Sequence, residues 1–153
     1  MIEPIEKTIQ VACTPDQAFT TFADNIGAWW PKEAHSVSAM SGKEAQRVVL
    51  ETKVGGRLYE IAHDGAEIDW GSVRTFDRHD RIVLAWHIGK SPDVATEVEV
   101  NFASSDNGTR VTLIHRDWEK NGDGAEELRE GYNKGWVNVF EVCFKKGCAP
   151  VAA

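Results

Sequence analysis

The sequence predicts an α+β domain in which a curved antiparallel sheet grips one long C-terminal helix, in the order β-α-β(n)-α. Three observations support this fold class. Residues 122–144 show the longest helical periodicity in the chain, several alternating segments joined by short turns precede them, and no strand–helix–strand rhythm separates those segments. A sheet with one wet face needs a cover for its dry face, and residues 122–144 form the one predicted element long enough to provide it.

Length and charge narrow the possible classes of protein. A chain of 153 residues suits a single domain, residues 1–153, with one core. Lys and Arg total 17 against 24 Asp and Glu, so the net charge is −7, which argues against nucleic-acid binding and against docking on an anionic membrane. We find no apolar run that could span a membrane and no apolar signal-peptide core at the N-terminus. Three sparse cysteines predict free thiols in a reducing cytoplasm.

The N-terminal part predicts a strand followed by a short helix. Apolar and polar side chains alternate over residues 5–11, which is typical of a strand with one wet face. Thr14 is expected to cap a helix that starts with the next residue, a proline, and continues to about Asn25. Trp29-Trp30-Pro31 follows, and the small, polar composition of residues 32–43 predicts a loop.

Six further strands are expected at close spacing. Their ranges are residues 46–51, 57–62, 68–76, 81–87, 96–103 and 109–116. Asn107-Gly108 between the last two is a strong hairpin signal. In residues 68–76 the alternation predicts that Trp70 and Arg74 share one face. Consecutive strands with short connections indicate an antiparallel meander.

Residues 122–144 are expected to form one continuous amphipathic helix. Asp123 is the predicted N-cap, with Glu126 in the capping-box position, and Gly147 provides a natural stop. The apolar stripe consists of Leu128, Tyr132, Gly135, Val139 and Cys143, widened by Trp136 and Phe140. This stripe is the surface that should pack on the sheet.

Six tryptophans are unusual in one small domain. Trp70 and Trp86 lie on strand faces, while Tyr132 and Trp136 lie one turn apart on the helical stripe. These rings either form ordinary core or line an apolar pocket, and we favour the pocket because so many indoles are hard to pack without gaps. Trp30 and its neighbouring tryptophan could form a lip over the pocket mouth, an exposed patch for a partner protein, or a plug at the sheet edge.

Glu60, Arg74 and His115 are the polar candidates for the site. A Glu60 side chain that points inward needs a partner, for which Arg57 and Arg74 are the candidates, and otherwise it is a surface carboxylate. His115 alternates onto an apolar strand face, where it could contact a ligand, shuttle a proton, or be a hydrogen-bonded core histidine. Acid–base chemistry through Glu60 and His115 would be possible if both reached one cavity.

The sequence contains no motif typical of metal binding, nucleophilic catalysis or phosphate binding. The five histidines show no paired spacing typical of metal ligands, and there is no C-x-x-C or G-x-S-x-G motif. Gly55-Gly56 is too short for a phosphate loop and indicates a bulge or a tight strand entry. We therefore expect no metal and no cofactor.

Several short motifs recur in a consistent order along nearly the whole chain. They are Ile9-x-Val11, Thr14-Pro15, Ala18-Phe19, Trp29-Trp30-Pro31, Gly55-Gly56-Arg57-x-Tyr59-Glu60, Trp70-Gly71-x-Val73, Arg81-Ile82-Val83-x-x-Trp86, Gly108-Thr109-x-Val111-x-Leu113-x-His115 and Gly131-Tyr132-x-x-Gly135-Trp136. This set resembles the SRPBCC (START-like, helix-grip) superfamily and, within it, the family related to the C-terminal domain of the activator of the 90-kDa heat-shock-protein ATPase. The resemblance implies the helix-grip fold and, as one possible activity, a co-chaperone-like protein-interaction module. It does not select an activity, because the superfamily hosts lipid binders, hormone binders, cyclases and co-chaperones.

The preferred hypothesis is a cytoplasmic protein that binds a small apolar or amphipathic ligand between the sheet and the C-terminal helix. The expected ligand contacts are Trp30, Glu60, Trp70, Arg74, Trp86, His115, Tyr132 and Trp136. Two alternatives stay open, namely a protein-interaction module with a protein partner and a cavity enzyme of the hydrolase, dehydratase or cyclase type. Neither nucleic-acid binding nor membrane insertion is expected.

Overall fold

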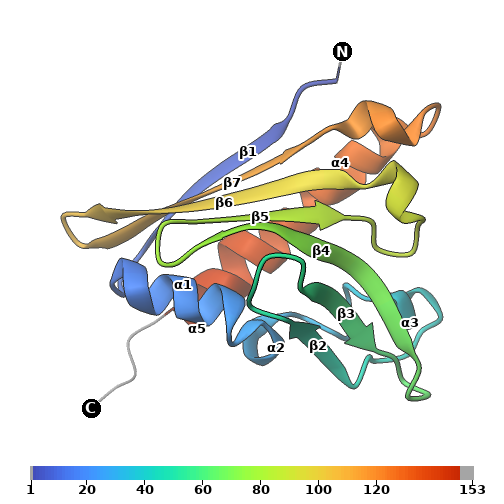
Figure 1. Cartoon of the computed structure of the whole chain (residues 1–153), viewed down its shortest axis with the longest axis horizontal. Coiled ribbons are helices and arrows are strands. Elements are labelled where there is room, and N and C mark those ends of the chain that lie inside the picture. The colour runs from blue at the N-terminus through green and yellow to red at the C-terminus, as the bar shows by residue number, and fades with distance from the viewer. Residues whose placement is uncertain (1, 149–153) are drawn as a thin grey trace.

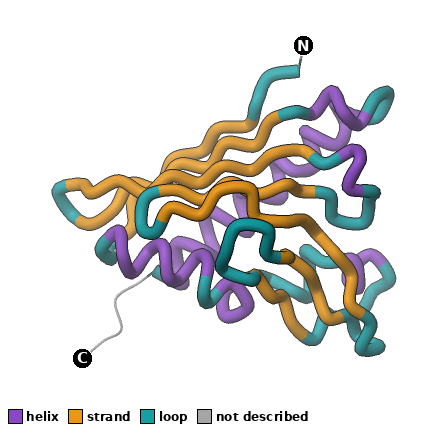
Figure 2. Tube along the Cα trace, in the orientation of Figure 1, coloured by secondary structure: helices purple, strands orange, loops and turns teal. Residues whose placement is uncertain are grey.

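The computed structural model describes residues 2–148, which contain a seven-stranded antiparallel sheet covered on one face by helices (Figures 1 and 2). The strands are β1 (Ile5–Val11), β2 (Arg47–Leu50), β3 (Arg57–Ile61), β4 (Glu67–Asp77), β5 (Arg81–Trp86), β6 (Thr96–Ser105) and β7 (Gly108–Arg116). Their order across the sheet is β1-β7-β6-β5-β4-β3-β2. Every predicted strand is therefore present, and the α+β prediction is confirmed.

The helices lie against one face of the sheet, and Figure 1 shows α4 crossing behind the central strands. They are α1 (Pro15–Ala23), α2 (Ile26–Trp29), α3 (Val37–Met40), α4 (Ala125–Trp136), a π-helical segment (Val137–Phe144) and α5 (Lys145–Gly147), with 3₁₀ turns at Pro92–Val94 and Trp118–Asn121. None of the helices in the described residues is long and apolar enough to cross a membrane.

The N-terminal helix begins as the sequence predicts. The Thr14 side chain accepts a hydrogen bond from the backbone N–H of Gln17, and the Gln17 side chain accepts one from the Thr14 backbone, so the two residues form a capping box. Residues 32–43 are not only a loop, because Val37–Met40 forms the short helix α3. The Ser36 side chain caps α3 by accepting from the backbone N–H of Ala39.

Strand β4 departs from simple alternation at two places. Its pairing with β3 shifts register beside Trp70, and its pairing with β5 shifts between Val73 and Thr75. The extra residue beside Trp70 reverses the alternation, so Trp70 and Val73 both point inward while Arg74 lies on the outer face. The prediction that Arg74 shares a face with Trp70 is therefore wrong. Such bulges also bend the strand, and Figure 1 shows β4 curving strongly along its length.

The C-terminal helix differs in detail from the prediction of one regular helix. The N-cap is Gly124 without a side-chain hydrogen bond, so the expected Asp123 cap is wrong. The helix continues beyond Trp136, but in π-helical form up to Phe144. Phe140 and Phe144 are fully buried and stack with ring centroids 5.7 Å apart. The apolar stripe thus packs on the sheet as expected. The cysteines, all within the described residues, are free thiols.

Gly71 allows β4 and β5 to approach closely. A Cβ atom at this position would lie 1.9 Å from the carbonyl oxygen of Ala85, which is backbone and cannot move aside. We therefore expect Gly71→Ala to lower the free energy of unfolding by about 3 kcal/mol, measured by urea denaturation. The matched control is Gly131→Ala in α4, where a Cβ meets nothing within 4 Å and helix propensity should raise stability by up to about 1 kcal/mol. Equal stabilities for the two variants would contradict the close approach.

Candidate functional site

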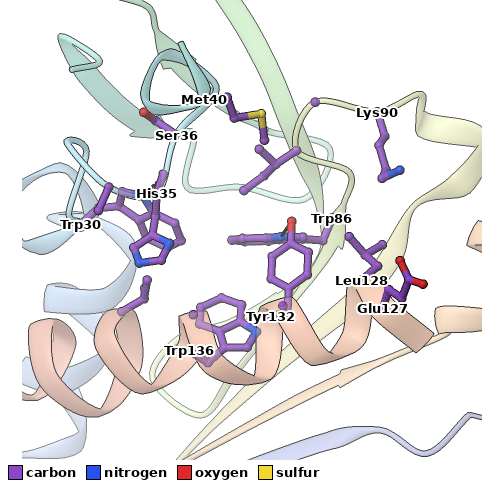
Figure 3. A pocket seen from close by; sticks show the side chains of 16 residues that line it. Trp30, His35, Ser36, Met40, Trp86, Lys90, Glu127, Leu128, Tyr132 and Trp136 are labelled. Carbon is purple, nitrogen blue, oxygen red and sulfur yellow. Dashed lines mark hydrogen bonds between the residues drawn. The ribbon is translucent and has the colours of Figure 1, made fainter. Parts of the chain in front are cut away.

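A cavity of about 510 Å³ opens between α4 and the sheet (Figure 3). Helix α4 contributes Leu128, Tyr132 and Trp136, strand β5 contributes Trp86, and the segment from α2 to α3 contributes Trp30 and His35. The size falls within the usual range of pockets for small molecules, about 300–1,000 Å³. The predicted space between sheet and C-terminal helix therefore exists.

Every tryptophan uses its indole N–H for a hydrogen bond inside the protein. The acceptors are Thr21 O for Trp29 (2.8 Å), His35 O for Trp30 (2.7 Å), Glu60 Oε1 for Trp70 (2.9 Å), Tyr132 Oη for Trp86 (3.2 Å), His115 O for Trp118 (2.9 Å) and His115 Nδ1 for Trp136 (3.1 Å). The rings of Trp30, Trp86 and Trp136 thus present carbon surfaces to the cavity.

The aromatic rings of the wall are in mutual contact. The ring centroids of Trp30 and Trp86 lie 5.9 Å apart, and those of Trp86 and Trp136 lie 5.4 Å apart. Trp70 packs behind this wall, 5.2 Å from Trp30, and does not line the cavity. Aromatic pairs at these separations add stability beyond their buried area, so the wall is a rigid part of the core.

Trp29 and Trp30 are both buried, which excludes the exposed-patch interpretation of this pair. Trp29 packs against Phe22 and Phe144 in the core, whereas Trp30 forms one side of the cavity. The two neighbouring indoles therefore have different roles, the first in core packing and the second in the cavity wall.

Glu60 is fully buried, and its carboxylate anchors the segment that carries α3. It accepts hydrogen bonds from Val37 N (2.6 Å), Ser38 N (3.1 Å), Ser38 Oγ (2.9 Å) and Trp70 Nε1 (2.9 Å). The expected pairing with Arg57 or Arg74 is wrong, since Arg57 contacts Asp69 and Glu67 and Arg74 contacts Glu97. The surrounding N–H and O–H groups satisfy the buried Glu60 side chain, and it does not line the cavity.

His115 is fully buried and completely hydrogen-bonded. Thr96 Oγ1 donates its proton to the carbonyl of Trp86 (3.1 Å), so it must accept from His115 Nε2–H (2.7 Å). His115 Nδ1 then accepts from the indole of Trp136, which assigns the neutral Nε2–H tautomer. Burial lowers the pKa of His115 to about 3. This side chain orients the Trp136 ring and does not line the cavity.

Of the eight predicted contact residues, half line the cavity and half do not. The four that line it are Trp30, Trp86, Tyr132 and Trp136. The four outside it are Glu60, Trp70, Arg74 and His115, of which Arg74 lies on the outer face of the sheet. Acid–base chemistry through Glu60 and His115 therefore has no access to the cavity.

Sequence reasoning missed the residues that surround the cavity mouth. Lys90 and Glu127 are exposed at the entrance, Met40 is 74% exposed beside them, and His35 is partly buried (Figure 3). Burial lowers the pKa of His35, and the Glu33 charge opposes this effect. Neither helical periodicity nor alternation marks these positions, because Lys90 and His35 lie in connections, Met40 ends the short helix α3, and Glu127 lies outside the apolar stripe of α4. An apolar Met within the polar segment 32–43 was the one available signal. In residues 2–148 no group of side chains could hold a metal ion.

A curved antiparallel sheet, a long C-terminal helix and a cavity between them define a helix-grip protein of the SRPBCC superfamily. The model of the family described as Activator of Hsp90 ATPase homolog 1-like protein matches residues 12–142. The chain therefore belongs to this family, as the sequence motifs indicated.

Solved structures include two with notable sequence identity. An anthrahydroquino-γ-pyrone synthase complexed with a compound abbreviated SUM is 33% identical, with 86% of this chain and 88% of that chain covered at a TM-score of 0.60. The self-sacrificing resistance protein CalC from Micromonospora echinospora is 27% identical, with 94% and 92% covered at a TM-score of 0.69. An Activator-like protein from Aeromonas hydrophila, 22% identical with 94% and 90% covered at a TM-score of 0.60, shows the same fold. The search of curated proteins finds no match.

Glu60 provides a direct test of the buried hydrogen-bond network. Glu60→Ala leaves the donors of Val37, Ser38 and Trp70 without their acceptor, so we expect the free energy of unfolding to fall by about 3 kcal/mol or more in urea denaturation. The control is Glu67→Ala, which removes an exposed carboxylate paired with Arg57 and should change stability by less than about 1 kcal/mol. A loss for Glu60→Ala as small as that of the control would refute the anchoring role.

The pH dependence of stability tests the neutral state of His115. Because its folded-state pKa lies near 3, below the ordinary 6.5, the unfolded state binds more protons as the pH falls through this interval. The contribution of His115 is therefore fully present above about pH 6.5 and is lost below it, with a slope approaching about 1.4 kcal/mol per pH unit. Comparing wild type with His115→Gln by urea denaturation between about pH 4.5 and 7 isolates this slope, since other groups titrate in both proteins. Parallel curves would mean that His115 takes up its proton equally in the folded and unfolded states, which would contradict a lowered pKa.

Proposed function

We propose that the protein binds a small, largely apolar, planar or amphipathic molecule in the cavity between the sheet and the C-terminal helix. The supporting observation is a cavity of about 510 Å³ whose deep wall consists of the indoles of Trp30, Trp86 and Trp136, with every indole N–H already bonded within the protein. Such a wall offers flat carbon surface and no free indole donor. It therefore favours an apolar ring system over a polar solute.

The mouth of the cavity favours an amphipathic ligand. Lys90 and Glu127 lie exposed at the entrance (Figure 3). A polar substituent of the ligand at this position would stay in contact with water and with these two charged side chains. The synthase and the resistance protein, 33% and 27% identical to this chain, are also compatible with a small-molecule role. The synthase structure is that of a complex with a compound.

The synthase, 33% identical to this chain, makes catalysis in the cavity a second candidate function. The groups available for it differ from those expected from the sequence, because Glu60 and His115 are enclosed behind the wall. Tyr132 and His35 are the ionisable side chains that reach the cavity near the rings. Conversion of a bound compound into a product of different retention or mass in liquid chromatography–mass spectrometry would distinguish an enzyme from a carrier.

A protein partner is the remaining alternative, supported by the name of the family. The exposed apolar side chains Val137 and Val142, 46% and 52% exposed on the π-helical segment, are the positions from which we would test it. The three free thiols favour a reducing compartment, and we expect the cytoplasm.

Native mass spectrometry followed by denaturing extraction tests the binding proposal. An additional mass that leaves on denaturation would support it and would reveal the chemical class of the ligand. A bare protein mass, together with unchanged indole fluorescence across a panel of fatty acids, sterols, flavonoids and aromatic acids, would overturn it.

Filling part of the cavity should weaken ligand binding without unfolding the protein. Gly131 lines the cavity, and a Cβ there meets nothing within 4 Å, so Gly131→Leu places a side chain in open space. We expect at least a tenfold loss of affinity for any ligand that quenches indole fluorescence in the wild type, with the thermal midpoint maintained or raised.

The matched control for this substitution is Glu130→Leu. It adds the same side chain to the adjacent exposed position of α4, outside the cavity. Wild-type affinity in Glu130→Leu and lost affinity in Gly131→Leu would localise the site. Equal affinity in both variants would exclude this cavity as the binding site.

A further inference from the structure

Tyr132 carries a hydrogen-bond donor that the protein itself does not use. Its hydroxyl oxygen accepts the indole N–H of Trp86 at 3.2 Å, which leaves the hydroxyl proton free. Among residues 2–148 no acceptor for that proton is present, and the side chain lines the cavity. Figure 3 shows the hydroxyl directed into the open space beside the Trp86 ring. Burial raises the pKa of Tyr132, so the group is a neutral phenol at neutral pH and can donate.

His35 lies on another side of the same space. Its backbone carbonyl accepts from the indole of Trp30, which holds the residue in place independently of its ring. Neither ring nitrogen has a hydrogen-bond partner among the described residues, and the ring lies 3.5 Å from a Cβ position at Gly135 in α4. A neutral imidazole offers one donor and one acceptor, so it can accept the proton of a hydroxyl group.

Ser36 and Lys90, two other polar residues that line the cavity, do not offer hydrogen bonds to a ligand in its deep part. The Ser36 hydroxyl is occupied, since it donates to Lys32 O and accepts from Ala39 N. The one ammonium group among the described lining residues, Lys90, is exposed at the mouth. The deep part of the cavity therefore combines flat aromatic walls with one phenolic donor and one imidazole.

We infer that the ligand, given the proposed binding function, is a planar aromatic ketone that carries a ring hydroxyl group. Tyr132 donates a hydrogen bond to the carbonyl oxygen, and the His35 ring accepts the hydroxyl proton. The rings of Trp86, Trp30 and Trp136 hold the aromatic plane by stacking and edge contacts.

Desolvation explains why such a ligand is preferred over a hydrocarbon of the same shape. An apolar molecule that displaces water from Tyr132 leaves its hydroxyl proton without an acceptor, which costs binding free energy. The carbonyl oxygen of a ketone ligand instead accepts the Tyr132 hydroxyl proton in place of that water. Saturated chains, such as those of fatty acids, would in addition forgo the aromatic contacts of the wall.

Three near-isosteric probes separate these contributions, namely fluorene, fluorenone and hydroxyfluorenone. Fluorenone exchanges the methylene group of fluorene for a carbonyl, and hydroxyfluorenone adds a ring hydroxyl. We expect the wild type to bind fluorenone about fivefold to tenfold more tightly than fluorene, as measured by indole quenching. In Tyr132→Phe this ratio should fall to about one. The infrared carbonyl band of bound fluorenone should lie at lower frequency in the wild type than in Tyr132→Phe, which a purely structural role of Tyr132 would not produce.

The controls use the same substitutions elsewhere in the chain. Tyr59→Phe alters the other tyrosine, which lies on the outer side of the sheet beneath Arg57, and should keep the wild-type ratio. His35→Leu should remove the preference for hydroxyfluorenone over fluorenone, whereas His63→Leu, in a turn outside the cavity, should preserve it.

Three results would overturn the inference, and they differ from one another. Equal affinity of the wild type for fluorene and fluorenone would refute the donor role of Tyr132 while leaving the cavity a binding site. A fluorenone preference or an infrared shift that persists in Tyr132→Phe would assign the donor to another group. Absence of binding for all three probes in the wild type would overturn the inferred ligand class, and together with a bare protein mass in native mass spectrometry it would reject the proposed function itself.

Discussion

The structure depends on the pairing of buried indole N–H groups. Each of the six tryptophans packs a large ring into a small domain and must also find an acceptor for one proton. The acceptors come from backbone carbonyls, one carboxylate, one imidazole and one phenol. Two of these bonds, from Trp86 to Tyr132 and from Trp136 to His115, join the sheet to the C-terminal helix. Glu60, the acceptor of Trp70, also binds the backbone of α3 and so joins that segment to the sheet.

This requirement explains the two buried polar residues that the sequence marked as possible ligand contacts. Glu60 accepts from Trp70 and from the backbone of α3, and His115 accepts from Trp136 while donating to Thr96. Both side chains make their hydrogen bonds behind the aromatic wall, and these bonds help to maintain the shape of the cavity. Among the polar groups that reach the cavity, the Tyr132 hydroxyl is the clearest case of a group with unused hydrogen-bonding capacity.

Whether a residue lies in the wall or behind it was decided by strand register. Alternation assigned the sheet and its dry face correctly over β6, where Val98, Val100 and Phe102 are all buried. It failed in β4, because the bulge beside Trp70 adds a residue and moves Arg74 to the outer face. A bulge is a feature of how two strands pair, so the sequence of one strand contains little information about it.

Local patterns in the sequence determined the fold class, the order of elements, the Thr14 cap and the apolar stripe that includes Tyr132 and Trp136, because each depends on residues a few positions apart. Only the tertiary structure decided which side chains share a cavity. The bond from Trp86 to Tyr132 joins residues 46 positions apart, and that from Val37 to Glu60 joins residues 23 positions apart. Periodicity cannot report such contacts, since they arise from the packing of elements whose relative positions are established only when the whole chain folds.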